Sequence, residues 1–291
     1  MLVLRGAERS FAAMADLFPE APIFTLLYDE AGTRGRFAGR RIATSRLQRI
    51  GASQDAFRRL LPLFPSAAER LPVGGHQVVL SSSSAFAHGV RPGPEAIHVC
   101  YCYTPFRYAW FEEDRARTEV PVPLRPALSA ALARHRRWDR RASARVDRYV
   151  AISELSRERI GRYLGRDAEI VYPPVEVERF TSAEPEDFFL IVCELVRHKR
   201  VDMALAAAQR AGARVVVVGA GPERSRLQAQ YGEIAEFSGR LDDDELAATY
   251  ARALAVIVPN VEEFGIAAVE AQAAGRPVLA ADAGGARETV V

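Results

Sequence analysis

The chain has 291 residues, of which 49% are hydrophobic and 26% are charged, and its formal net charge is +2. This length suits two domains of about 100–200 residues or one large α/β unit, and the composition excludes a disordered, collagen-like or coiled-coil chain. No run approaches 18 apolar residues, residues 1–6 lack the features of a secretory signal, and the three cysteines fit reduced thiols. We therefore expect a cytoplasmic protein without a membrane span, and the charge balance points to no nucleic-acid partner.

Short β-branched runs alternate with helical segments along the whole chain. In the first half the pattern predicts strands at 23–27, 77–80, 97–100 and 149–152, and helices at 8–17 and 52–61. After residue 174 the alternation becomes strict, with strands predicted at 188–193, 214–218, 234–237, 255–258 and 277–280. The helices predicted between and after them are 201–211, 222–231, 242–253, 265–274 and 286 onward. Such alternation predicts βαβ units and a parallel sheet.

A break between two halves is predicted at residues 173–187. This stretch holds three prolines and an acidic run, and it has neither the helical nor the strand period. We therefore expect an N-terminal domain at 1–173, a linker at 174–187 and a C-terminal domain at 188–291. Two α/β halves with a cleft between them are the simplest architecture.

A glycine turn follows the apolar run 215–218. Gly219 and Gly221 stand between this predicted strand and the next helix, where glycines let a ligand approach the backbone and helix N–H groups suit a phosphate. The third glycine of the dinucleotide fingerprint is missing, which disfavours an NAD site. The alternative is a tight turn that binds nothing.

Two glutamates eight residues apart flank the start of another predicted helix. Glu262 follows a parallel strand, and Glu270 lies inside the helix. Carboxyl ends of parallel strands bind ligands in open sheets, and carboxylates accept hydrogen bonds from the vicinal hydroxyls of a ribose or hexose. The alternative is that Glu262 caps the helix and Glu270 is merely exposed.

A cation cluster at 197–200 follows the predicted strand 188–193. It contains Lys199, the one lysine of the chain, whereas the other 38 basic residues are arginine. Cations at this edge of a sheet can neutralise a diphosphate, and Lys199 is the expected contact. The alternative is a solvated charge run.

The first half offers aromatic residues and arginines. Tyr103, Arg107, Tyr108 and Trp110 follow a predicted strand, as does the serine run 81–84, and the rings could stack on a sugar, face a lipid headgroup or belong to the core. Seven arginines and Trp138 lie between residues 134 and 148. Such a run suits contact with anionic lipid or a solvated helix face.

Two patterns resemble metal sites without supporting one. The aspartates at 242–244 stand where a helix should begin, so they are expected to cap it. Cys100 and Cys102 lack the second pair that would complete a zinc site. We therefore expect no metal ion and no cofactor.

Taken in order, these motifs resemble those of glycosyltransferase family 4, the retaining enzymes of the GT-B fold. The segment from Glu262 to Glu270 is the most specific part, and 171–180 and 270–278 are also similar to family signatures. Within the family, 103–110 and 195–200 resemble bacterial mannosyltransferases of O-antigen and exopolysaccharide assembly.

The resemblance implies an α/β GT-B fold in which two Rossmann-like domains face each other across a cleft. The N-terminal domain would bind the acceptor and the C-terminal domain a nucleotide-sugar. By the family pattern the catalytic residues are Glu262, Lys199, Arg197 and Tyr103. The expected donor-binding residues are Glu270, Lys199, Arg200, Gly219, Gly221, Phe264, Gly265, Ile266 and Gly6. The acceptor-side candidates are Arg107, Tyr108 and Trp110.

The expected reaction is retaining transfer of a hexose, mannose from GDP-mannose, to a lipid-linked or polysaccharide acceptor, at the inner face of the plasma membrane and without a metal ion. One alternative is a donor such as UDP-glucose or another nucleotide-sugar. The other is an inactive binding or scaffold protein of the same fold, because Tyr103 and Glu194 stand where many relatives have His and Arg. Relative to the family pattern, we also expect the first strand and the C-terminal helix to be missing.

Overall fold

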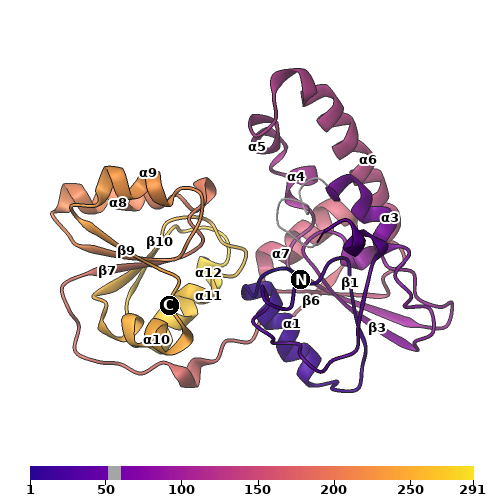
Figure 1. The fold of residues 1–291 in the computed structure, drawn as a ribbon, viewed down its shortest axis with the longest axis horizontal. Helices are drawn as coiled ribbons and strands as arrows, with labels where there is room; N and C mark the ends of the chain where they lie inside the picture. The colour runs from indigo at the N-terminus through magenta and orange to yellow at the C-terminus, as the bar shows by residue number, and fades with distance from the viewer. Residues whose placement is uncertain (52–59) are drawn as a thin grey trace. The chain divides into compact units, whose positions relative to one another are not determined.

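The computed structural model describes residues 1–51 and 60–291, so the helix predicted at 52–61 lies almost wholly outside the described residues. The chain divides into two compact units, Met1–Pro173 and Pro174–Val291. Each unit combines helices with parallel strands (Figure 1), which confirms the predicted α/β class. No helix among the described residues is long and apolar enough to cross a membrane.

The second unit contains a five-stranded sheet in which every neighbouring pair is parallel. Its strands are β7 (Phe189–Val192), β8 (Val215–Val218), β9 (Ala235–Gly239), β10 (Ala255–Val258) and β11 (Val278–Ala280). All five were predicted, to within two residues at each end. The spatial order is β11-β10-β7-β8-β9, so the chain winds outward from β7 in one direction and then returns to wind in the other. The direction changes between β7 and β10, and open sheets bind ligands at such a point.

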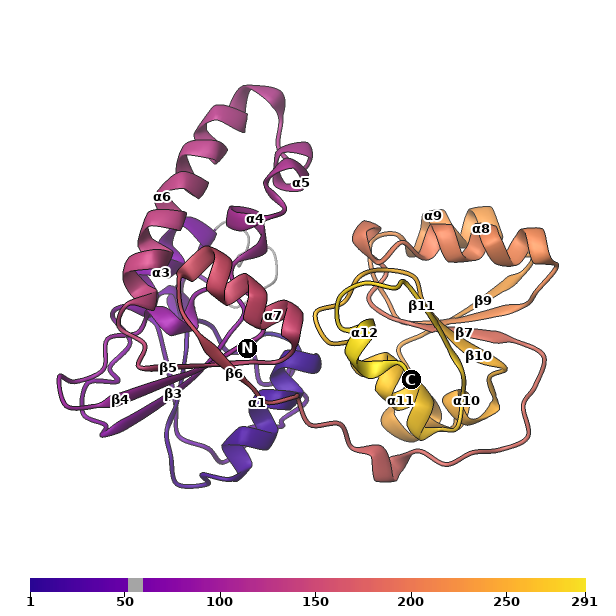
Figure 2. The ribbon, with the colours of Figure 1, turned by 180° about the vertical axis from the view of Figure 1, so that it is seen from behind.

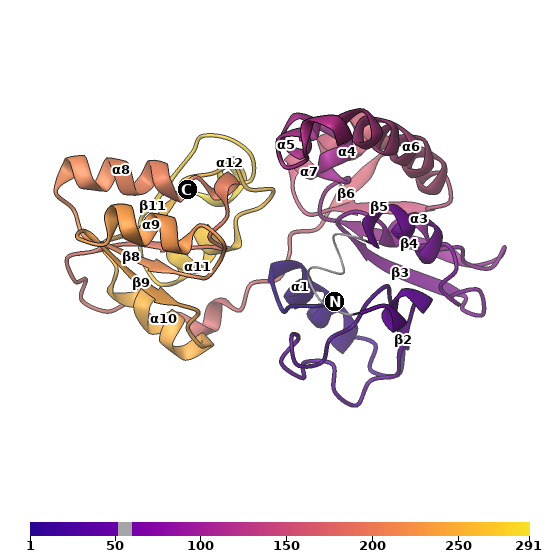
Figure 3. The ribbon, with the colours of Figure 1, turned by 45° about the horizontal axis from the view of Figure 1, so that its top comes forward.

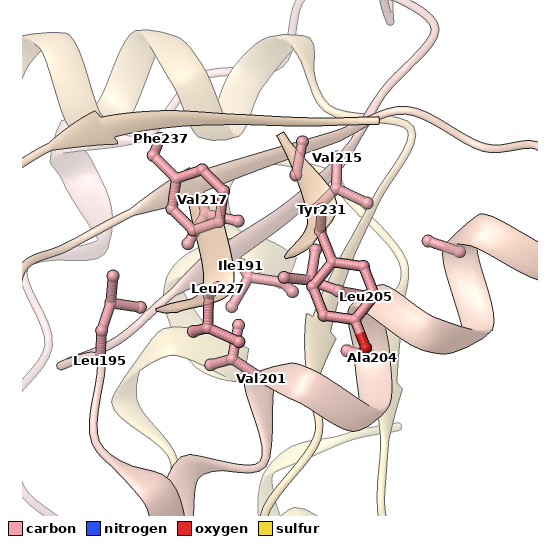
Figure 4. Packing of buried hydrophobic residues seen from close by; sticks show 12 residues of the cluster. Ile191, Leu195, Val201, Ala204, Leu205, Val215, Val217, Leu227, Tyr231 and Phe237 are labelled. Carbon is pink, nitrogen blue, oxygen red and sulfur yellow. The ribbon is translucent and has the colours of Figure 1, made fainter. Parts of the chain in front are cut away.

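Helices cover both faces of this sheet. They are α8 (Val201–Ala211) and α9 (Arg224–Tyr231) on one face, and α10 (Asp243–Arg252) and α11 (Ile266–Ala273) on the other, with α12 (Ala286–Thr289) after β11 (Figure 1). Alternate residues of each strand point to opposite faces, so Ile191 and Val217 join Leu205 and Leu227 in one core cluster (Figure 4). Leu190 joins the other cluster. The inner strands β7, β8 and β10 are largely buried on both faces, which explains why they read as uninterrupted apolar runs.

The aspartate run at 242–244 caps α10, as predicted. The Asp242 carboxylate accepts hydrogen bonds from the backbone N–H groups of Asp244 at 3.0 Å and Glu245 at 2.9 Å. Cys100 and Cys102 are buried, free thiols. Across residues 1–51 and 60–291, no group of three or more His, Cys, Asp or Glu side chains could hold a metal ion.

The segment expected as a linker lies within the second unit. Residues 176–183, which we call the strap, contain one 3₁₀ turn, Val177–Arg179. Phe180 is buried in the core cluster beneath α10, the Arg179 guanidinium lies 3.4 Å from Asp243, and Arg276 donates to the Ala183 carbonyl at 2.7 Å. Three contacts, at Arg179, Phe180 and Ala183, therefore tie the strap to the rest of the second unit.

The first unit contains a four-stranded parallel sheet and a separate parallel pair. The sheet follows sequence order, with β3 (Val78–Ser83), β4 (Ile97–Cys102), β5 (Arg148–Ala151) and β6 (Ala168–Ile170), and the pair is β1 (Ile23–Thr25) and β2 (Ile42–Thr44). Three serines of the run 81–84 lie inside β3, so the prediction that this run follows its strand was wrong. Pairing with neighbours on both sides extends β4 beyond its apolar run.

Six helices of the first unit lie within the described residues. They are α1 (Gly6–Asp16), α3 (Phe64–Ala68), α4 (Arg107–Trp110), α5 (Glu113–Thr118), α6 (Arg125–Ser143) and α7 (Glu154–Arg159), the last followed by a π-helical turn, Ile160–Leu164. The 19-residue α6 is the longest, and α5 folds back beside its first turns (Figure 2). Within this unit α1 and α6 lie on opposite sides of the β3–β6 sheet (Figure 3).

Candidate functional site

An ion pair joins two loops at the carboxyl edge of the second unit's sheet. Lys199 follows β7, Glu262 follows β10, and the Lys199 ammonium donates a hydrogen bond to Oε1 of Glu262. The two side chains are 19% and 24% exposed. Because the winding direction changes between β7 and β10, the pair lies where an open sheet binds its ligand. Beside it, burial raises the pKa of the Cys193 thiol to about 12, so that group is uncharged at neutral pH.

A strained turn sets the direction of Lys199. Residues Arg197–Lys199 form one 3₁₀ turn, and Arg200 then adopts a left-handed conformation with φ +53° before α8 begins. Few residues other than glycine adopt this conformation, and such strain concentrates at functional sites. Arg197 and Arg200 are exposed, whereas Lys199 is half-buried and contacts Glu262. Sequence reasoning did not foresee the strained arginine.

The segment after β11 hydrogen-bonds to the backbone of the loop that carries Glu262. The Gly285 N–H donates to the Glu262 carbonyl at 2.9 Å, and the Thr289 hydroxyl donates to the Phe264 carbonyl at 3.3 Å. A Cβ at Gly285 would lie 2.3 Å from that carbonyl oxygen, so only glycine fits there. Phe264 is buried, Gly265 has φ +95°, and Ile266 opens α11. These contacts fix the backbone that presents Glu262.

Glu270 lies on α11 and is half-buried. Its Oε2 accepts a hydrogen bond from the Tyr250 hydroxyl at 2.9 Å, so the alternative of a merely exposed residue is wrong. Tyr250 comes from α10 and is fully buried. Burial and the charge of Glu270 raise the pKa of this phenol well above its usual value, so it remains a donor. Tyr250 was missed in the sequence because its apolar surroundings made it read as core.

The glycine turn after β8 is pressed against the loop after β7. Gly219 has φ +141°, and a Cβ there would lie 1.9 Å from the Cys193 carbonyl oxygen, while one at Gly221 would lie 2.3 Å from that of Leu195. The Leu195 N–H donates to the Ala220 carbonyl at 3.0 Å. Close packing of two loops therefore requires both glycines whether or not a ligand binds. The same contact supports the turn that carries Lys199.

In the first unit, Tyr103 contacts the first turn of α1, the helix that begins at Gly6. The Tyr103 phenol donates to the Ala7 carbonyl at 2.8 Å and accepts from the Ser82 hydroxyl at 3.0 Å. Gly6 is the first residue of α1 and is half-buried. Burial raises the pKa of Tyr103 to about 12. This tyrosine therefore orders the first turn of α1, and it has no titration near neutral pH.

The acceptor-side candidates are engaged in packing within the same unit. Trp110 stacks on Tyr163 with ring centroids 5.3 Å apart, and its indole N–H donates to the buried Asp139. The Arg115 guanidinium lies over the Tyr108 ring at 5.6 Å. Arg107 lies 3.8 Å from the Glu112 carboxylate. The rings of Tyr108 and Trp110 thus contribute to the α4–α6 region, as the core alternative predicts.

Comparisons with known proteins agree with the fold. Residues 175–291 match the family model described as glycosyl transferases group 1. A GDP-mannose-dependent monoacylated alpha-(1-6)-phosphatidylinositol monomannoside mannosyltransferase of Corynebacterium glutamicum is 32% identical over 184 residues, which cover 52% of this chain and 48% of that protein. A D-inositol 3-phosphate glycosyltransferase of Streptomyces bingchenggensis is 30% identical over 261 residues, which cover 69% and 56%.

A solved structure resembles nearly the whole chain. Sucrose-phosphate synthase from Thermosynechococcus elongatus aligns with a TM-score of 0.68 at 15% identity, covering 98% of this chain and 76% of that one. At this identity the likeness shows the fold alone, and it confirms the predicted GT-B class. The chain spans about half the length of the curated relatives above.

Proposed function

We propose that this chain, a GT-B glycosyltransferase of the family 4 type, transfers a hexose from a nucleotide-sugar to a glycan or lipid-linked acceptor with retention of anomeric configuration. The observation that carries the proposal is the Lys199–Glu262 pair at the point where the winding of the sheet reverses. A cation and a carboxylate side by side suit a ligand that carries both a diphosphate and a sugar.

Each residue of the pair has a separate task in the proposed reaction. Lys199, assisted by Arg197 or Arg200, neutralises the diphosphate and stabilises the charge that develops as the bond from the anomeric carbon to the phosphate oxygen breaks. Glu262 contacts the transferred sugar, and Glu270 contacts the ribose hydroxyls. The acceptor hydroxyl forms the new bond on the face that the diphosphate leaves, and its proton passes to the departing phosphate. The reaction as proposed uses no metal ion.

GDP-mannose is the proposed donor, and its support is the similarity to the GDP-mannose-dependent mannosyltransferase of Corynebacterium glutamicum. UDP-glucose or another nucleotide-sugar is the second candidate. Calorimetric titration of the full chain with GDP, UDP and their sugars separates the two, since the proposed donor should bind tightest. Absence of binding to every nucleotide would refute both.

An inactive binding protein is the remaining candidate, because Tyr103, at a position where the family resemblance implies a histidine, is buried and hydrogen-bonded, with a pKa of about 12. Incubating the chain with radiolabelled GDP-mannose and a polyprenyl-linked acceptor tests it. Donor binding without labelled product would favour this candidate over the enzyme.

Contact with anionic lipid is proposed for the exposed side of α6. Arg134, Arg137 and Arg141 are exposed at a spacing that places them on one helix face, and Val122 and Leu124 before α6 are 66% and 56% exposed. Trp138 does not belong to this face, because its indole donates to Glu69 at 2.9 Å and its ring packs on Phe86. Replacing the three arginines by glutamine should abolish sedimentation with vesicles containing phosphatidylglycerol, and unchanged sedimentation would refute the proposal.

A further inference from the structure

Tyr250 connects the strap, α10 and Glu270. Its side chain is fully buried, and its hydroxyl reaches from α10 to Oε2 of Glu270 on α11. At the other end, its ring meets the Phe180 ring of the strap edge-on, with centroids 5.5 Å apart and an interplanar angle of 88°. Both ends of the side chain are therefore held, one by aromatic packing and one by a hydrogen bond to a carboxylate.

A buried phenol that donates to a half-buried carboxylate does more than fill space. Leaving a buried donor unpaired costs free energy. The Tyr250 hydroxyl therefore keeps its hydrogen bond to Glu270, and this bond restrains the Glu270 carboxylate. The hydrogen bond to Oε2 restricts rotation of the carboxylate. A carboxylate whose rotation is already restricted loses less freedom when it receives two adjacent hydroxyls.

We propose that Tyr250 is a positioning residue of the donor site, whose phenol orients the Glu270 carboxylate to receive the vicinal ribose hydroxyls of a nucleoside diphosphate. This inference rests on the proposed function, in which Glu270 contacts the ribose. Tyr250 itself touches no ligand. Its effect should therefore be confined to ligands that carry the ribose hydroxyls.

The test compares GDP with 2′,3′-dideoxy-GDP in calorimetric titrations of the full chain. Tyr250→Phe keeps the ring against Phe180 and removes the hydroxyl. We expect this variant to bind GDP roughly 2- to 12-fold more weakly, the range that one hydrogen bond supports, and to bind the dideoxy analogue as the parent does. In a Glu270→Ala background the same substitution should add no further loss.

Tyr231→Phe is the matched control. Tyr231 is also buried in the second unit, but its hydroxyl accepts from Gln230 at 3.1 Å in the cluster beneath α8 and α9. This variant should change neither affinity. Thermal melting verifies that each variant folds, and if Tyr250→Phe does not fold, Phe180→Leu loosens the same ring and should give a smaller loss with the same selectivity.

Equal weakening of both nucleotides, or no weakening of GDP, would overturn the positioning role. If the parent chain binds GDP and prefers it over the dideoxy analogue, such a result refutes this inference alone. If the parent chain binds no nucleotide, the proposed function fails and the inference fails with it.

Discussion

Replacing Glu262 by glutamine should tighten the binding of a nucleoside diphosphate, although Glu262 belongs to the proposed site. In the structure the Lys199 ammonium is paired with this carboxylate, and both side chains are less than a quarter exposed. A diphosphate that binds Lys199 must displace the carboxylate or share the lysine with it, and the two anions repel each other. Glutamine removes both effects while it preserves the size of the side chain.

The magnitude follows from the burial of the pair. Exposed ion pairs contribute about 0.2–1 kcal/mol, and hydrogen bonds to charged groups contribute about 1.5–3 kcal/mol. A half-buried pair lies between these ranges, so we expect a gain of about 1 kcal/mol, or roughly five-fold in the dissociation constant of GDP. Sugar transfer should fall at the same time, because the carboxylate that contacts the sugar is gone.

Calorimetry with GDP at two ionic strengths measures the effect. The gain should shrink at high salt, since it is electrostatic. Glu233→Gln makes the same charge change at an exposed residue just before β9, at the opposite edge of the sheet, and should leave the affinity unchanged. Weaker or unchanged GDP binding by Glu262→Gln would refute the reasoning, because it would mean that Glu262 does not compete with the diphosphate for Lys199.

Three further predictions concern the lysine, the glycine turn and a buried histidine. Lys199→Ala should weaken GDP binding by about 10- to 150-fold in the same titration. An unchanged dissociation constant would show that Lys199 does not contact the diphosphate. Gly219→Ala should lower the free energy of unfolding in urea by more than about 1–3 kcal/mol, because the added Cβ would lie 1.9 Å from the Cys193 carbonyl oxygen. The control Gly212→Ala, where a Cβ would meet no atom within 4 Å, should lower it by about 1 kcal/mol. Equal losses in the two variants would contradict the packing explanation. Burial lowers the pKa of His98 from 6.5 to about 4. Between these pH values the imidazole is protonated in the unfolded chain but not in the folded one, so the free energy of unfolding should fall as the pH drops from about 6.5 to about 4. Urea unfolding at pH 7 and pH 5 measures this fall, and a His98→Gln variant with an equally steep fall would show that another group causes it.

The second unit was predictable from its sequence because its inner strands, β7, β8 and β10, are largely buried on both faces. An apolar run of four or five residues between helical periods has one good interpretation, and all five strands were found. In the first unit the short strands β2 and β6 were missed, since Ala43 and Glu169 at their centres leave no run of strand-forming residues to recognise. The serines of β3 read as a loop, because a hydroxyl that pairs inside a sheet looks the same in a sequence as one that faces water.

The candidate site was predictable in its residues but not in their contacts. The spacing of Glu262 and Glu270 and the lone Lys199 are visible in the sequence. Their partners are not, because the ion pair spans 63 residues and the bond from Tyr250 spans 20. The left-handed backbone of Arg200 could not be foreseen either, since nothing about an arginine signals that conformation.

The boundary between the two units along the sequence decides where the chain can be cut to produce them separately. A protein cut before Phe188, at the end of the proline-rich segment, would leave β7 and every later strand in place. It would also remove Phe180 from the ring of Tyr250 and Arg179 from the neighbourhood of Asp243. A C-terminal half intended to stand alone should therefore begin at Pro174. A shorter one would lack Phe180 and leave a cavity in the core beneath α10.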